Sequence, residues 1–78
     1  MVFTAMIMYE NDTTLEKVYR LRHIARYIKR VREGNPSIAY IRSLPIIPWL
    51  IDLVFEEADH SIPIKCIEIQ ERITYHES

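Results

Sequence analysis

The 78-residue sequence contains one glycine, one cysteine and two phenylalanines. With Gly34 alone, it cannot form a G-x-G-x-x-G dinucleotide loop or a G-x-x-x-x-G-K-[ST] phosphate loop, because both need several residues without a Cβ atom. The single cysteine, Cys66, excludes an internal disulfide, which argues against a disulfide-stapled secreted scaffold. We therefore expect a reducing compartment and a cytoplasmic protein.

The sequence also lacks a long uninterrupted apolar run. Its most apolar window, residues 38–55, is about the minimum length of a membrane span, but Arg42, two prolines and Asp52 interrupt it. The segment VFTAMIMY, residues 2–9, has no basic leader and no small-residue cleavage site after it. We expect it to belong to the fold rather than to a signal peptide, and we predict no membrane contact.

Apolar residues are plentiful: 49% of the chain is hydrophobic, including thirteen isoleucines. A chain of this length buries only roughly 60–65% of the surface that its unfolded form exposes, so its own core is limited. The sequence therefore predicts one domain, residues 1–78, that forms a homodimer or binds a larger protein.

Hydrophobic periodicity predicts a small α+β fold. Residues 2–9 are typical of a strand covered on both faces, since both alternation phases are apolar. A long helix is predicted from residue 13 or 14 to 33, with turn and N-cap oxygens at 11–13, a capping box that Thr13 and Glu16 could form, and Gly34 at its end. The apolar face of this helix would consist of Val18, Leu21, Ile24, Ala25, Ile28 and Val31.

Three shorter elements follow. A second helix is predicted from an Asn35 cap to Pro45, and a third from Pro48 through the apolar segment that ends near Asp59. From Lys65 the period becomes two, which predicts a half-exposed strand with Ile67, Ile69, Ile73 and Tyr75 on one face. If the terminal strands pair, they form a two-stranded ribbon that the helices cover or a second subunit extends.

The long helix is basic on its outer face. Residues 13–33 carry a net charge of +5, and residues 46–78 carry −5. The basic face either binds an acidic surface or phosphate, or is neutralised by the acidic C-terminal half within the fold or across a dimer. The candidate partner-binding residues are Tyr19, Arg22, Arg26, Lys29 and Arg30.

Three functions remain open. The favoured hypothesis is a small regulatory or inhibitory binding protein that occludes a partner protein through this basic face, with arginines that bind carboxylates in two parallel hydrogen bonds. The second is a nucleic-acid-binding regulator that uses the same cations, with tyrosines for stacking. The third is a self-associating structural subunit.

Trp49 and Phe55 lie in the apolar third helix. We expect Trp49 to belong to the core of a domain with few large aromatic residues. The alternative is that Trp49 and Phe55 form a hydrophobic interface, since tryptophan is enriched at the centres of protein interfaces.

The sequence predicts no enzyme, no cofactor and no metal. Glu56, Asp59 and His60 could approach a metal, but zinc needs three or four ligands in tetrahedral geometry and the other histidines lie far away in sequence. Cys66 has no helix N-terminus before it to stabilise a thiolate, so we expect a small hydrophobic core residue rather than a nucleophile.

The order strand, helix, turn, helix resembles that of ribbon-helix-helix repressors. In that family the outward residues of the strand are polar and contact bases. Here residues 2–9 offer only Thr4 among Val2, Met6 and Met8, and a further strand follows Pro63. These differences outweigh the shared order, so the sequence assigns no family.

Overall fold

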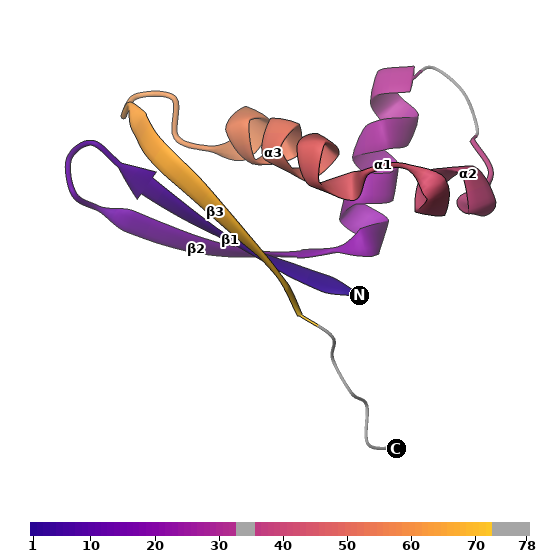
Figure 1. Cartoon of the computed structure of the whole chain (residues 1–78). Helices are drawn as coiled ribbons and strands as arrows, with labels where there is room; N and C mark the ends of the chain where they lie inside the picture. Colours follow the sequence, from indigo (N-terminus) through magenta and orange to yellow (C-terminus); the bar gives the residue numbers. More distant parts are fainter. Residues whose placement is uncertain (33–35, 73–78) are drawn as a thin grey trace. The chain divides into compact units, whose positions relative to one another are not determined.

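The computed structural model describes residues 1–32 and 36–72 (Figure 1). Its elements are β1 (Val2–Tyr9), β2 (Thr14–Arg20), α1 (Leu21–Arg32), α2 (Ile38–Ser43), α3 (Ile46–Glu57) and β3 (Ile64–Arg72). The predicted α+β class is confirmed. The described chain divides into a sheet unit, residues 1–21 and 59–72, and a helical unit, residues 22–58.

The sheet unit is a three-stranded antiparallel sheet in the order β2-β1-β3 (Figure 1). The terminal strands β1 and β3 pair, as expected, with Ile7 opposite Ile67 and Ala5 opposite Ile69. Residues directly opposite each other share a face, so these side chains lie on one side of the sheet. Ile7 and Ala5 are fully buried, which makes this the buried face.

The third strand of the sheet, β2, is formed by residues of the same chain, between β1 and the first helix. The prediction that the long helix begins at residue 13 or 14 is wrong, because residues 14–20 form β2 and pair with β1 along its length. The capping box between Thr13 and Glu16 is therefore wrong as well. Thr14, Val18 and Tyr19 are residue types that favour strands, and pairing with β1 satisfies backbone groups that a helix would have bonded internally.

A tight turn between β1 and β2 fixes this pairing. Asp12 has a φ of 68°, in the left-handed region, and its N–H donates to the Tyr9 carbonyl oxygen at 3.1 Å. Asn11 Oδ1 accepts hydrogen bonds from both the backbone N–H and the hydroxyl of Thr13, at 3.1 and 2.5 Å. Of the two roles that the sequence allowed for this oxygen, a turn or a helix cap, it takes the turn and closes a hairpin.

Two helix starts in the helical unit differ from the prediction: α2 begins later, at Ile38, and α3 begins earlier. Ser37 caps α2 by accepting from the Tyr40 N–H at 3.1 Å, whereas the predicted cap Asn35 lies outside the described residues, as does Gly34. α2 ends at Ser43, before Pro45, as predicted. α3 begins at Ile46 rather than Pro48, and a proline is tolerated there because the first four N–H groups of a helix lack intrahelical partners.

The buried residues of the helical unit are apolar. Ile24 and Ile28 of α1 are fully buried, as expected for the predicted apolar face of this helix, whereas Val31 is half exposed. α2 and α3 add Ile41, Leu50, Leu53 and Val54. Each such side chain contributes about 1.5–3 kcal/mol when it is fully removed from water.

β3 agrees with the predicted strand over most of its length. It begins at Ile64, one residue before the predicted Lys65, and Ile67 and Ile69 share a face as expected. Ile73 and Tyr75 lie outside the described residues. Among the helices that the structure describes, none is long and apolar enough to cross a membrane.

A second polar turn precedes β3. Asp59 Oδ1 accepts hydrogen bonds from the backbone N–H and hydroxyl of Ser61, at 2.9 and 2.6 Å. The hydroxyl bond, and then the backbone bond, lower the pKa of the Asp59 carboxyl below its ordinary value. The Glu10 N–H donates to the Pro63 carbonyl oxygen at 2.9 Å, which ties this turn to the end of β1.

Substitution of Asp12 tests the hairpin turn. Asp12→Gly should stabilise the protein by up to about 1 kcal/mol, because glycine adopts positive φ without steric cost, and Asp12→Val should destabilise it by about 1–2 kcal/mol. Urea unfolding measures both. Glu10→Gly, in the same loop, is the control: it should lower stability by about 0.5–1 kcal/mol. A loss of stability in Asp12→Gly would contradict the left-handed turn.

Substitution of Ser61 tests the second turn. Ser61→Ala should raise the pKa of Asp59 toward its ordinary value, as followed by NMR of the carboxyl carbon, whereas Ser43→Ala should leave it unchanged. Because the folded-state pKa is lowered, the stabilisation is present above the unfolded-state pKa and is lost as pH falls through the folded-state pKa. Ser61→Ala should therefore flatten the acid limb of a stability–pH curve; an identical limb would disprove this contribution.

Candidate partner-binding surface

Three cations form a continuous line on α1. Arg22, Arg26 and Lys29 lie at i, i+4 and i+7, so they share one side of the helix and span about 10 Å along its axis. All three are exposed, and none has an ion pair or hydrogen bond with another described residue. We call Arg22, Arg26 and Lys29 the basic stripe.

Arg30, the fourth predicted cation, is engaged within the helical unit. Its guanidinium forms an ion pair with Glu56 of α3 and lies 5.4 Å from the centre of the Tyr27 ring. The alternative that acidic residues of the C-terminal half neutralise the basic face therefore holds for Arg30. The Arg30 and Glu56 side chains are 63% and 46% exposed, so solvent screens the pair and it contributes little stability.

An aromatic cluster joins the three helices of this unit. The Tyr27 and Trp49 rings meet edge to face, with centroids 6.2 Å apart and planes at 70°. The Arg32 guanidinium lies 5.4 Å from the Trp49 ring centre and 5.2 Å from that of Tyr40, and it donates a hydrogen bond to the Tyr40 hydroxyl. No spacing in the sequence predicts this cluster, because its members come from three separate helices.

The surroundings of Tyr27 in this cluster also change the pKa of its phenol. Burial first, and then the carboxylates of Glu56 and Asp52, raise the pKa of the Tyr27 phenol, while Arg30 opposes them. A raised pKa keeps the phenol neutral well above pH 7. Tyr27 is half-buried, and its ring packs edge to face on Trp49.

Tyr19 is not on the basic face. The prediction that it lies on the helix with the cations is wrong, because it belongs to β2, where it is 4% exposed. Its ring lies 5.7 Å from the Lys17 ammonium of the same strand. The error follows directly from the misplaced start of the helix.

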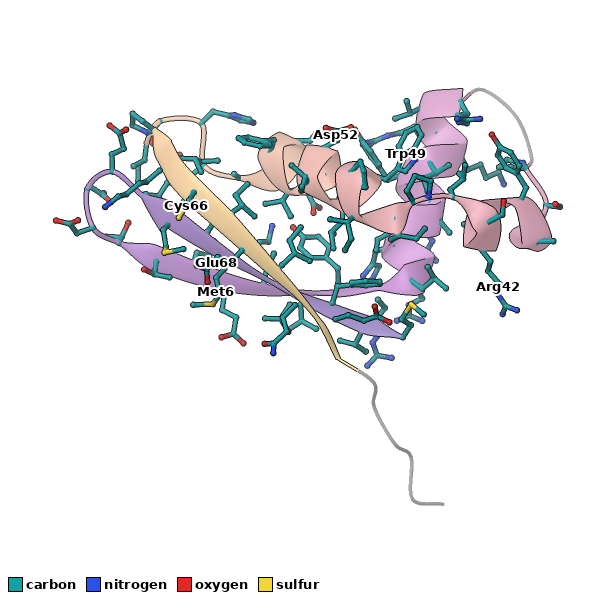
Figure 2. The ribbon with its side chains drawn as sticks, in the orientation of Figure 1. Met6, Arg42, Trp49, Asp52, Cys66 and Glu68 are labelled. Atoms are coloured by element: carbon teal, nitrogen blue, oxygen red, sulfur yellow. The ribbon has the colours of Figure 1, made fainter. Side chains whose placement is uncertain are left out.

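α3 presents apolar side chains to solvent. Trp49 is half-buried in the aromatic cluster (Figure 2). Phe55, in contrast, is 48% exposed. Ile47, at 41% exposure, and the half-buried Ile51 lie on the same side of the helix as Phe55, since each is four residues from the next. We call Ile47, Ile51 and Phe55 the apolar stripe.

Cys66 is exposed, so the expectation of a core residue is wrong. It lies on the sheet face opposite the buried one, with its Sγ 3.6 Å from Met8 Sδ (Figure 2). Over residues 1–32 and 36–72, no three histidine, cysteine, aspartate or glutamate side chains gather as a metal site would require. Glu56 instead pairs with Arg30, and Asp59 binds Ser61.

Comparison with known proteins supplies no further constraint on this surface. No protein-family model matches the chain, and no curated protein or solved structure matches it.

A double-mutant cycle measures how far Arg30 is engaged. Arg30→Gln and Glu56→Gln, singly and together, should give a coupling energy of about 0.2–1 kcal/mol in unfolding experiments, falling as salt increases. The cycle between Arg26 and Glu56 is the control and should give no coupling. A zero coupling for Arg30 and Glu56 at low salt would mean that Arg30 is available to a partner together with the basic stripe.

Proposed function

We propose that this protein is a small regulatory or inhibitory binding protein, without enzymatic activity, that docks its basic stripe on an acidic surface of a partner protein and so occludes that surface. The observation that carries the proposal is the exposure of Arg22, Arg26 and Lys29 on one side of α1, without an acidic partner among the described residues. A line of unpaired cations costs self-repulsion along a helix, and an acidic partner relieves it.

The apolar stripe favours a protein over a nucleic acid as that partner. Protein interfaces combine an apolar centre with a charged rim, and the helical unit offers both kinds of surface in Phe55 with its neighbours and in the basic stripe. Arginine suits the charged part, because its planar guanidinium binds a carboxylate through two parallel hydrogen bonds.

The aromatic residues supply little support for nucleic-acid binding. Single-strand binding proteins stack bases on exposed aromatic rings. Here Tyr19 is buried in β2, and arginine guanidinium groups lie against the rings of Tyr27, Tyr40 and Trp49. The three cations of the basic stripe would also neutralise few phosphates, which predicts weak and shallowly salt-dependent binding to DNA.

Fluorescence anisotropy with two labelled probes tests the proposal. A polyglutamate peptide represents a carboxylate surface and duplex DNA represents phosphate, each at about 50 and 200 mM salt. The full chain should bind polyglutamate, and Arg22→Glu/Arg26→Glu should reduce that affinity at least tenfold. Arg42→Glu/Lys65→Glu is the matched control, since it changes two exposed cations outside the stripe by the same total charge.

Two results would contradict the proposal. Equal losses in the stripe variant and its control would mean that net charge, and not the basic stripe, binds the peptide. Tighter binding of DNA than of polyglutamate, with a steep salt dependence that the stripe variant removes, would support the nucleic-acid-binding alternative instead.

A further inference from the structure

The exposed face of the sheet carries a polar groove that is separate from the basic stripe. The side chains of Thr4 and Met6 point to the face opposite the buried Ile7, because alternate residues of a strand point to opposite faces. Met6 lies opposite Glu16 of β2 on one side and opposite Glu68 of β3 on the other. Two carboxylates thus flank one thioether across three strands, and Figure 2 shows Met6 and Glu68 near each other on the sheet.

The same part of the sheet carries an open groove of about 560 Å³. It is lined by Thr4, Met6, Glu16, Glu68, Ile69 and Gln70. All of them belong to the sheet unit, so one rigid sheet and its register form the whole groove.

Thr4 adds a hydroxyl group to the lining of the groove. The residue is 4% exposed, and its side chain makes no hydrogen bond to another described residue. A ligand in the groove can donate a hydrogen bond to Thr4 Oγ1 or accept one from it.

The charge of the groove selects cations. Glu16 and Glu68 have no ion pair with a described residue, and no basic side chain that the structure describes lines the groove. Lys17, the adjacent cation of β2, points to the opposite face. The occupant must therefore bring its own positive charge.

The spacing of the carboxylates selects two positive charges rather than one metal ion. β2 and β3 lie on opposite sides of β1, so the backbones at Glu16 and Glu68 are about 10 Å apart. Oxygen ligands bind Ca²⁺ or Mg²⁺ at about 2.0–2.6 Å, and the Met6 thioether between the two carboxylates is a poor ligand for such hard cations.

We propose that this groove binds a small organic dication, an alkyl chain with an ammonium group at each end. One ammonium pairs with Glu16 and the other with Glu68, and the methylene chain packs on the thioether of Met6. The Thr4 hydroxyl accepts a hydrogen bond from an ammonium N–H. The polar ends and the apolar middle of the groove match the polar ends and the apolar middle of such a molecule.

NMR titration of the full chain with 1,4-diaminobutane tests this proposal. The diamine should give saturable shifts of the Met6 methyl and of the Thr4 and Gln70 amides. 1-Aminobutane should bind at least threefold more weakly because it carries one charge. Glu16→Gln or Glu68→Gln should each lower the affinity about threefold, as expected for one exposed ion pair, and the double variant should abolish saturation.

Two further variants separate the groove from general charge. Glu71→Gln is the matched control, since Glu71 is on β3 but opposite Phe3, on the other face of the sheet, and its affinity should equal that of the wild type. Thr4→Val keeps the shape of the side chain and removes the hydroxyl, and it should lower the affinity severalfold. The amide spectrum of each variant without diamine verifies that the sheet is intact.

Several outcomes would overturn the proposal. Equal effects of Mg²⁺ and the diamine, or equal losses in Glu71→Gln and Glu68→Gln, would mean that the carboxylates respond only to ionic strength. Groove shifts that follow protein concentration, rather than diamine concentration, would mean that a second copy covers this face. Binding of a lysine-rich peptide with no binding of the diamine would assign the groove to a protein segment instead.

Discussion

The pairing of β1 on both of its edges is the constraint on which the sheet unit depends. β2 and β3 each bond to β1, and their registers place Ile7 and Ala5 on the buried face and Met6 on the exposed face. A slip of one residue in either pairing would shift that neighbour's side chains to the other face. Glu16 or Glu68 would then enter the buried face, at the high cost of an unpaired buried carboxylate. The same register therefore maintains both the core and the groove.

The strands were predictable where one pattern dominates. Residues 2–9 and the alternating residues after Pro63 have the composition and period of strands, and both form them. Residues 14–20 were not predictable, because Val18 continues the apolar helical stripe of Ile24 and Ile28, while the segment also contains strand-forming residues. The Asn11 side chain did not decide between them, since its oxygen can cap a helix or close a turn. Pairing with β1, a contact between separate segments, decides it.

Of the candidate surface, the sequence predicted only the part that lies on α1. Arg22, Arg26 and Lys29 lie within α1, whose period was interpreted correctly, so their common side follows from the sequence. The engagement of Arg30 by Glu56 joins residues 26 positions apart, and the groove requires the register of three strands. Neither relationship has a local signal. Periodicity in one segment specifies which residues share a face, and only tertiary pairing specifies which faces meet.

The near-neutral net charge of −1 conceals two surfaces of opposite sign. The basic stripe is on the helical unit, and the paired carboxylates of Glu16 and Glu68 are on the sheet unit. At about 0.1 M salt the field of an exposed charge is screened within roughly 10 Å, a distance comparable to the length of the stripe. A ligand close to an exposed charge therefore experiences the local charge more than the net charge. If the two surfaces bind as proposed, selectivity between anions and cations would arise from this local placement of charges.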